Sequence, residues 1–483
     1  MLFKISAARN DDDKRVFFYD NETNILQRDD GHIFKYDDSN KEPVDTKKLV
    51  ESLPFSKDVP LKKSKLVKKI KLQLGLSCNY SCSYCSQRFI ERAAETSKKD
   101  IDIFMEKLEN LEFDEQLGLR LEMWGGEPLV YWKTLVPLAE RLKNKFKDWK
   151  SPPKFIMITN GSLLNKEKCQ WLYEQGFFIA ISHDGPGQHI RGPDPFDDPV
   201  KKKDILDFYR LMKPLNRISF NSILSASNYS RKTIFDWFVN LTDDPNVILG
   251  EGVFVDSYDE GGLGETLNTL ESHFKFRQVG YSDFMDNNGN IGFWSVHRKI
   301  RSFSDSILGQ VNAKYVGQKC GMDDAQILAL DLRGNVITCQ NTSAVEISNN
   351  GESHLGGTLD DIESVEIKSA THWRNRPDCA GCPVLHLCKG SCMFLDNNYW
   401  EASCNTSYSE NISIFCLTFE QLTGYVPYFI DSPNLTNDRK DIWGWIFEHP
   451  DIPKKNVFPI KVVVEKTIVN ELEVYRKSSV TSI

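Results

Sequence analysis

The sequence lacks any long apolar run, and no stretch approaches the ~20 residues that a membrane span needs. The first residues, MLFKISAARNDDDKRV, have neither a long apolar core nor a small-residue cleavage site, so we expect no secretory signal. The chain also lacks an excess of positive charge. Its net charge of −8 over 483 residues argues against general nucleic-acid binding. We therefore expect a cytoplasmic protein that works on neither a membrane nor a nucleic acid.

The composition, 40% hydrophobic and 27% charged, is that of a globular protein, and its length favours two or three domains. Without an export signal, the 12 cysteines should stay reduced. They are unevenly placed, with three at 78–85, one at 169 and eight between 320 and 416. Such clustering favours metal binding over disulfides. Cys169, in a helical pattern beside Trp171, is interpreted as packing.

Residues 69–260 alternate between strand-like and helix-like patterns. Six strand-like runs, beginning with KIKLQLGLSC and ending with NVILGEGVFV, are separated by helical patterns such as WKTLVPLAERLKNKFKDW. This alternation predicts a parallel sheet with helices outside it. Six units are too few for a closed eight-stranded barrel, so the predicted fold class is α/β, a partial (β/α)6 TIM-like barrel. Polar motifs follow the first four strands, at the carboxyl ends where such folds place their chemistry.

The flanking segments are less informative. Residues 1–68 predict a small β-rich module from the runs RVFFYD, NILQR and HIFKY, and the basic stretch LKKSKLVKKIK is interpreted as a solvated connection. Residues 261–315 predict a helical bridge, 316–425 form a cysteine-rich segment, and 426–483 form a C-terminal extension of unknown role.

Three cysteines, Cys78, Cys82 and Cys85, lie in one loop at the end of the first predicted strand. A structural zinc site needs a closed set of four ligands, and no histidine stands within the loop. An iron–sulfur cube takes one cysteine per iron, so three cysteines would leave one iron open. The loop alone does not decide between the two.

The spacing CxxxCxxC, with Tyr84 before the last cysteine, resembles the radical S-adenosylmethionine superfamily. WGGEP at 124–128, after the second strand, resembles the family's GGE motif, and SHDG at 182–185 is similar to the motif on the ribose and carboxylate side. TNG at 159–161 ends the third strand, as it does in many members.

The resemblance implies that Cys78, Cys82 and Cys85 hold a [4Fe–4S] cluster whose open iron binds S-adenosyl-L-methionine. Reductive cleavage would then release a 5′-deoxyadenosyl radical, chemistry that belongs to the cofactor and not to the protein. Glycines without a Cβ would let the backbone approach the ligand closely. The residues expected to contact S-adenosylmethionine are Gly125, Gly126, Glu127, Asn160, Ser182 and Arg191. The general base is unknown.

The later cysteines resemble the SPASM domain, an extension that carries auxiliary clusters in peptide and protein maturases. Its signature, CxnGx4C, then CxxCx5CxxxC and a final Cys, is matched through Gly334 and the cysteines. The resemblance implies a nearer [4Fe–4S] cluster on Cys320, Cys339 and Cys392, and an outer one on Cys379, Cys382, Cys388 and Cys404. Cys416 is an alternative to Cys404. The nearer cluster lacks a fourth cysteine and has an open iron or borrows a ligand. A zinc ribbon is the competing interpretation.

Three function classes follow. The preferred one is a maturase that abstracts hydrogen from a ribosomally made precursor peptide, with leader and core, and forms a C–C, thioether or ether crosslink or an oxidised residue. The second is an activator of a folded enzyme, like sulfatase-maturing members. The third is a non-catalytic iron–sulfur scaffold. A flavodoxin or ferredoxin would supply electrons, and the 1–68 module is a candidate for leader-peptide recognition.

Overall fold

The computed structural model describes residues 1–36, 49–52, 54–87, 96–345, 347, 353–368, 370–432 and 437–449. Much of the predicted 426–483 extension therefore lies outside the described residues. No helix in this part of the chain is both long and apolar enough to cross a membrane.

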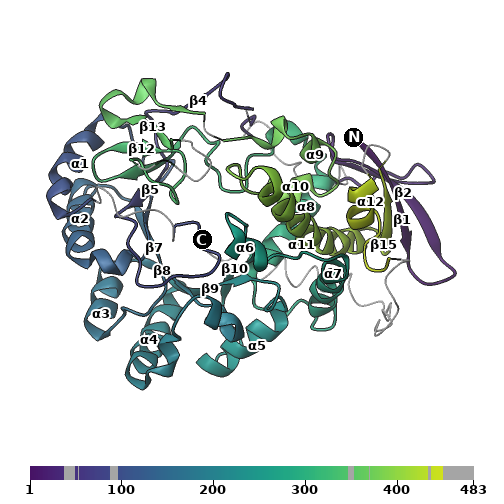
Figure 1. Cartoon of the computed structure of the whole chain (residues 1–483), viewed down its shortest axis with the longest axis horizontal. Helices are drawn as coiled ribbons and strands as arrows, with labels where there is room; N and C mark the ends of the chain where they lie inside the picture. Colours follow the sequence, from purple (N-terminus) through teal and green to yellow (C-terminus); the bar gives the residue numbers. More distant parts are fainter. Residues whose placement is uncertain are drawn as a thin grey trace.

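A nine-stranded sheet occupies the left half of the view in Figure 1. Its order is β10-β9-β8-β7-β6-β5-β11-β12-β13. The six successive parallel strands are β5 (Lys69–Gln73), β6 (Arg120–Trp124), β7 (Lys154–Thr159), β8 (Phe178–Ser182), β9 (Ile218–Leu224) and β10 (Leu249–Phe254). The predicted α/β class with a parallel sheet is thus confirmed.

The remaining strands of this sheet come from the cysteine-rich segment. β11 (Ile327–Asp331) pairs in parallel with β5, and β12 (Asn335–Ile337) and β13 (Leu355–Thr358) continue antiparallel from it. β5 is therefore flanked on both sides and its residues from Ile70 to Gln73 are all buried. Two of these four buried residues, Lys71 and Gln73, are polar, so their side chains need hydrogen-bond partners within the fold.

Helices cover the outer side of the parallel strands, as Figure 1 shows. They are α1 (Ile101–Lys107), α2 (Trp132–Lys145), α3 (Lys166–Glu174), α4 (Pro199–Met212) and α5 (Arg231–Thr242). Each of the last three begins at a polar cap, for example Asn165, whose side chain accepts from the Lys168 N–H. Cys169 on α3 is 5% exposed within this packing.

The second half of the chain is mainly helical. Its helices are α6 (Glu260–Gly264), α7 (Leu270–Met285), α8 (Trp294–Leu308), α9 (Pro377–Ala380), α10 (Leu385–Cys388), α11 (Asn397–Thr423) and α12 (Asn437–Trp443). α11 is buried along most of its length and packs against α7 and α8.

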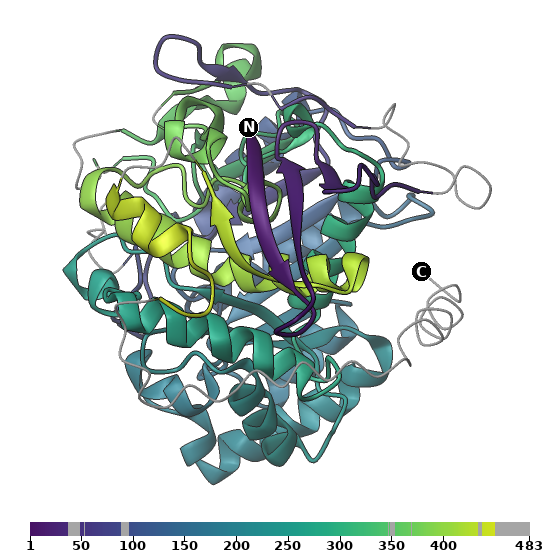
Figure 2. The same cartoon turned by 90° about the vertical axis from the view of Figure 1, so that its right-hand side faces the viewer.

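The N-terminal strands form an antiparallel sheet that faces the viewer in Figure 2. Its order is β15-β1-β2-β3, with β1 (Leu2–Ala8), β2 (Lys14–Asp20), β3 (Ile25–Arg28) and β15 (Val426–Asp431). The sequence analysis missed β1, and HIFKY forms only a single bridge, Gln27 to Ile33. The rings of Tyr19 and Phe17 pack edge-to-face against Phe415 and Phe419 of α11, so one face of this sheet belongs to the core.

The basic stretch at 61–71 is not the solvated connection that its composition predicted. Leu61–Lys62 forms β4, which pairs with β14 (Glu366–Ile367). Lys63 is 6% exposed, and its Nζ donates to the carbonyl oxygens of Met322 (2.7 Å) and Asp324 (2.9 Å). These partners lie far along the chain, where no local pattern could indicate them.

Candidate active site

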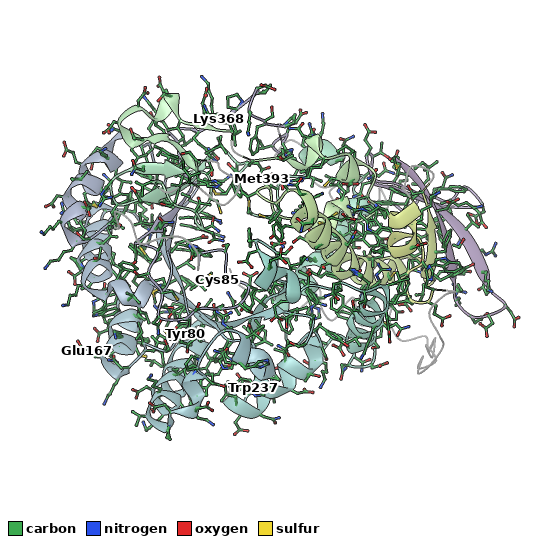
Figure 3. The ribbon with its side chains drawn as sticks, in the orientation of Figure 1. Tyr80, Cys85, Glu167, Trp237, Lys368 and Met393 are labelled. Carbon is green, nitrogen blue, oxygen red and sulfur yellow. The ribbon has the colours of Figure 1, made fainter. Side chains whose placement is uncertain are left out.

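The three-cysteine loop leaves the carboxyl end of β5 and places Cys78, Cys82 and Cys85 in half-buried positions. In Figure 3, Cys85 lies near the middle of the molecule, between the sheet and the helices of the second half. The Cys78 Sγ accepts from the Tyr80 N–H, and the Cys85 Sγ from the Gln87 N–H, both at 3.4 Å. Backbone N–H donors thus face two of the three sulfurs, and the Tyr80 N–H favours the thiolate of Cys78.

Burial works in the opposite direction. It raises the pKa of Cys82 to about 11, although Arg191 opposes this, and it raises that of Cys78 as well. A metal group that replaces the thiol protons removes this penalty. Among the described residues, no three His, Cys, Asp or Glu side chains converge on one metal-ion position. Three thiols on one loop fit a [4Fe–4S] cluster that leaves one iron open.

The GGE motif packs directly on this loop. A Cβ on Gly125 would lie 2.2 Å from the Gly75 carbonyl oxygen, and one on Gly126 would lie 2.3 Å from that of Ser77. Gly126 and Glu127 donate their N–H groups to those same carbonyls at 3.0 Å. The missing Cβ at both glycines lets the backbone at Gly75 and Ser77, just before Cys78, approach closely, and the contact of the glycines with S-adenosylmethionine stays a prediction.

Glu127, 2% exposed, joins the ends of two strands. Its carboxylate accepts from the N–H groups of Leu129 (3.0 Å) and Asn160 (2.7 Å) and from the Thr159 hydroxyl (2.6 Å). Burial raises its pKa in spite of these donors. The Asn160 amide in turn lies 4.0 Å from the Cys78 sulfur and donates to the Asn79 side chain at 3.0 Å. The structure therefore brings Glu127 and Asn160 to the cysteine loop.

The end of β8 contributes Ser182, which pairs in register with Asn221, and the buried His183 and Asp184 that follow it. The two buried residues have separate partners, since His183 contacts Asp194 and Asp184 accepts from the Tyr84 hydroxyl at 2.8 Å. They form no dyad.

Arg191 links this segment to the cysteine loop. Its guanidinium donates to the Tyr84 hydroxyl at 2.6 Å and lies 3.5 Å from Asp184. The Arg191 Nε is buried without a hydrogen-bond partner. A buried guanidinium donor without a hydrogen-bond partner fits an anionic ligand. A carboxylate of S-adenosylmethionine has the chemistry to accept it.

Four later cysteines line one small cavity: Cys379, Cys382, Cys388 and Cys404. The Cys404 Sγ accepts from Arg439 at 3.4 Å. Cys416 lies elsewhere on α11, 4.0 Å from the Pro427 carbonyl oxygen. Of the two alternatives for the closing residue, the structure brings Cys404 to the others.

The other three, Cys320, Cys339 and Cys392, form a second group. Burial raises the pKa of Cys339 to about 12, and the negative charge of Cys320 raises it further. Burial also raises the pKa of Cys392, and the charges of Asp256 and Cys339 add to that increase. The Asn341 N–H donates to the Cys339 sulfur at 3.4 Å, and the Tyr258 hydroxyl to the Cys392 sulfur at 3.3 Å. Gly334, with a φ of +77°, makes the tight β11–β12 turn before Cys339.

Two groups near these cysteines escaped the sequence analysis. Lys71 on β5 is 7% exposed, and its Nζ lies 3.5 Å from the Cys320 carbonyl oxygen and 3.2 Å from the Gln340 side chain. Trp124, which precedes the GGE motif, donates its indole N–H to Asn341 at 2.8 Å. The basic run and the WGGEP motif were visible, but their partners depend on the fold.

No protein-family model matches the chain. Over 361 residues it is 23% identical to the radical SAM cyclopropyl synthase TigE of Paramaledivibacter caminithermalis, a match covering 68% of each protein. Over 170 residues it is 25% identical to the serine-type anaerobic sulfatase-maturating enzyme of Bacteroides thetaiotaomicron, covering 34% of this chain and 36% of that protein.

The fold is similar to that of native anSMEcpe with bound AdoMet, at a TM-score of 0.54 and 16% identity, over 74% of this chain and 98% of that chain. It is also similar to the same protein with bound AdoMet and Cp18Cys peptide, at a TM-score of 0.51 and 15% identity, over 74% and 99% of the two chains. The chain with this three-cysteine loop and GGE motif is thus similar in sequence to a radical SAM cyclopropyl synthase and to a sulfatase-maturating enzyme, and similar in fold to a protein solved with bound AdoMet.

Proposed function

We propose that the chain is a peptide maturase built on a partial (β/α)6 barrel with a SPASM-type extension. Bound S-adenosylmethionine and the loop cluster would supply a 5′-deoxyadenosyl radical that abstracts hydrogen from a peptide. The observation that carries this proposal is a loop with three half-buried thiols that packs on the GGE backbone and is bonded through Tyr84 to Arg191, whose Nε is buried without a partner.

Within this proposal, Cys78, Cys82 and Cys85 hold the loop cluster. Gly125, Gly126 and Glu127 keep the loop in place and, together with Asn160 and Ser182, line the position of S-adenosylmethionine. Arg191 would bind the carboxylate through its free Nε. Tyr84 keeps its proton, because burial raises its pKa well above the usual value, and that proton is held against Asp184.

We assign the nearer auxiliary cluster to Cys320, Cys339 and Cys392. The outer one is assigned to Cys379, Cys382, Cys388 and Cys404, which share one cavity. Lys71 and Lys63 bring positive charge to the Cys320 side, where three thiolates on one cluster would otherwise leave negative charge buried. Burial lowers the pKa of Lys63 to about 8, so an anionic neighbour also stabilises its charge.

The triple variant Cys78→Ala, Cys82→Ala, Cys85→Ala tests the cleavage site. We expect it to abolish 5′-deoxyadenosine formation under reducing, anaerobic conditions, while iron at the other seven cysteines is retained. Continued cleavage by this variant would contradict the assignment of the loop.

Peptide modification rests on the relatives. TigE is named a cyclopropyl synthase, and closing a cyclopropane ring forms a C–C bond; anSMEcpe was solved with a bound Cp18Cys peptide. Co-expression with short precursor peptides, followed by mass spectrometry, tests the reaction class. We expect a loss of two hydrogens per modification, and a mass gain or an unchanged mass would contradict crosslinking and oxidation.

A second candidate is activation of a folded sulfatase, because the chain also matches a sulfatase-maturating enzyme. A sulfatase-derived peptide carrying Ser or Cys at the modified position separates the two. Its oxidation by this enzyme, with precursor peptides unmodified, would favour the second candidate.

Leader recognition by residues 1–68 is better tested by substitutions than by deleting the module. β1 pairs with β15, and the Asn21 amide donates to the carbonyls of Ala380 (3.0 Å) and Cys382 (2.9 Å), so removing the module would expose the outer cysteine group. Leu2→Asp with Lys4→Glu alters only the exposed face of β1. A weaker affinity for the precursor peptide is expected, and an unchanged affinity would exclude this face as its binding site. A flavodoxin or ferredoxin remains the proposed electron donor.

A further inference from the structure

Tyr258 lies at the sheet edge where the chemistry is proposed, four residues beyond the end of β10. The carboxyl ends of parallel strands meet at one edge, so Tyr258 and the three-cysteine loop belong to the same side of the sheet. The segment that carries Tyr258 is fixed to α11. The Ser257 N–H donates to the Ser403 hydroxyl at 2.9 Å, and the Ser257 hydroxyl donates to the Tyr399 carbonyl oxygen at 3.0 Å.

The Tyr258 hydroxyl donates to the Cys392 sulfur at 3.3 Å. Its neighbour Asp256 is occupied, since one carboxylate oxygen accepts from the Ser391 hydroxyl at 3.2 Å and the other lies 3.7 Å from the Lys319 Nζ. The phenol is thus the polar group of this segment that reaches a cysteine of the nearer group. Cys392 also has a backbone donor, the Phe394 N–H, and Cys339 has one in the Asn341 N–H.

A hydrogen bond to a cluster sulfur favours the reduced state, because the added electron increases the negative charge on the sulfur ligands. Because the Tyr258 hydroxyl donates to the Cys392 sulfur at 3.3 Å, we take it to act on that sulfur and not on the iron that three cysteines leave open. Removing the bond should therefore lower the reduction potential without removing a ligand.

We propose that Tyr258 is a positioning residue that raises the reduction potential of the cluster held by Cys320, Cys339 and Cys392. This inference rests on the proposed auxiliary cluster. Its consequence is that the nearer cluster accepts an electron more readily than a cluster with the same ligands and no such donor.

The test is Tyr258→Phe in the full-length chain, reconstituted anaerobically with iron and sulfide. Redox titration followed by electron paramagnetic resonance measures the potential, and Cys320→Ala identifies the signal of the nearer cluster. We expect unchanged iron and about a tenfold lower ratio of reduced to oxidised cluster at a fixed ambient potential, equivalent to about 59 mV for a one-electron couple.

Tyr399→Phe is the matched control, because its hydroxyl donates to Glu260 at 3.0 Å and not to a sulfur. Its potential should equal that of the unmodified chain. An unchanged potential in Tyr258→Phe with full iron content would overturn the proposed role of Tyr258 and leave the auxiliary cluster in place. Loss of the nearer cluster's iron in Tyr258→Phe would also overturn it, by assigning the hydroxyl to holding the site. If Cys320→Ala left iron and spectrum unchanged, no cluster would sit there, and the auxiliary-cluster part of the proposed function would fall as well.

Discussion

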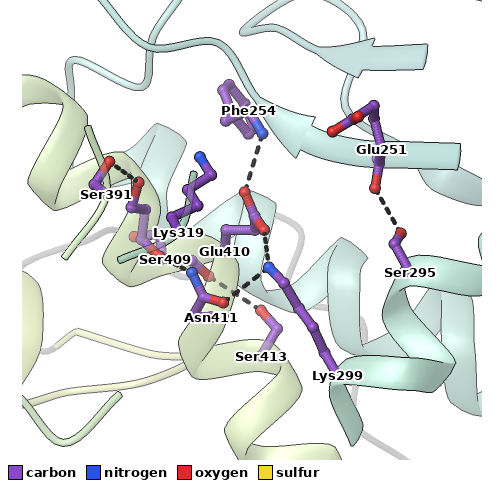
Figure 4. Close-up of polar contacts among 12 residues, drawn as sticks. Glu251, Phe254, Ser295, Lys299, Lys319, Ser391, Ser409, Glu410, Asn411 and Ser413 are labelled. Carbon is purple, nitrogen blue, oxygen red and sulfur yellow. Dashed lines mark hydrogen bonds and ion pairs between the residues drawn. The ribbon is translucent and has the colours of Figure 1, made fainter. Parts of the chain in front are cut away.

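Glu410 on α11 offers the sharpest test of how the second half of the chain is held to the sheet (Figure 4). Its carboxylate is 3% exposed and accepts from the Phe254 N–H (3.0 Å), at the end of β10, and from the Lys299 Nζ (2.7 Å), on α8. Burial alone would raise its pKa, but Lys299, Arg231 and Lys319 outweigh burial and lower it from 4.5 to about 2.

The size of the effect follows from this shift. A lowering of about 2.5 units corresponds to about 3 kcal/mol of stability at neutral pH. Because the folded-state pKa lies below the unfolded value, this contribution is complete above about pH 5.5 and is lost as the pH falls through 4.5 toward 2. Breaking a buried ion pair by removing one partner costs about 3–5 kcal/mol, which agrees with this figure.

We therefore expect Glu410→Gln to lower the free energy of unfolding by about 3 kcal/mol at pH 7 and by progressively less below pH 5. Hydrogen exchange at the Phe254 amide should accelerate by about 100-fold, since about 1.4 kcal/mol is a factor of ten. The control is Asp236→Asn, whose pair with Lys232 is on the surface and should contribute less than about 1 kcal/mol. Two results would refute the stabilising role of the Glu410 carboxylate. One is a loss of unfolding free energy in Glu410→Gln no larger than in Asp236→Asn, and the other is a loss that stays the same below pH 5.

Three further predictions concern the cysteine sites and a buried histidine. Gly126→Ala should lower iron binding at the loop and 5′-deoxyadenosine formation, because its Cβ would meet the Ser77 carbonyl oxygen at 2.3 Å; Gly264→Ala, with open space around it, should leave both unchanged. Cys404→Ala should lose iron and Cys416→Ala should retain it, since Cys404 alone of the two lines the cavity with Cys379; equal iron loss in both would contradict this. Burial, with Arg277, lowers the pKa of His273 from 6.5 to about 3, so stability should fall as the pH drops below 6.5, by about 2 kcal/mol at pH 5. His273→Asn should flatten this slope in urea unfolding measured between pH 7 and 5, and an unchanged slope would argue against it.

The sequence predicted the parallel strands well because the evidence for them is local. Each strand is a short apolar run followed by a polar motif, and helices with their own caps lie between them. The cysteine loop, the GGE residues and Asp184 follow their strands directly, so predicting the strands also placed these residues at one edge of the sheet.

What the sequence could not predict depends on partners distant in the chain. β1 reads as part of an N-terminal module, but its pairing partner β15 begins at Val426. Lys63 reads as a solvated lysine until Met322 and Asp324 supply its acceptors. The choice between Cys404 and Cys416 is of the same kind, because both lie on one helix and only its packing decides which face meets the outer group.

The strand β5 joins the three-cysteine loop to the segment that follows Cys339. From one strand, the Lys71 side chain reaches Gln340, and the Gln73 amide donates to the carbonyl oxygens of Gln340 (2.9 Å) and Thr342 (2.8 Å), on either side of Asn341. The same strand runs directly into the loop that carries Cys78. Any shift of the segment after Cys339 must therefore move β5 or break buried hydrogen bonds, each of which costs free energy. β5, with β11 paired alongside it, therefore connects the three-cysteine loop to the group that contains Cys339.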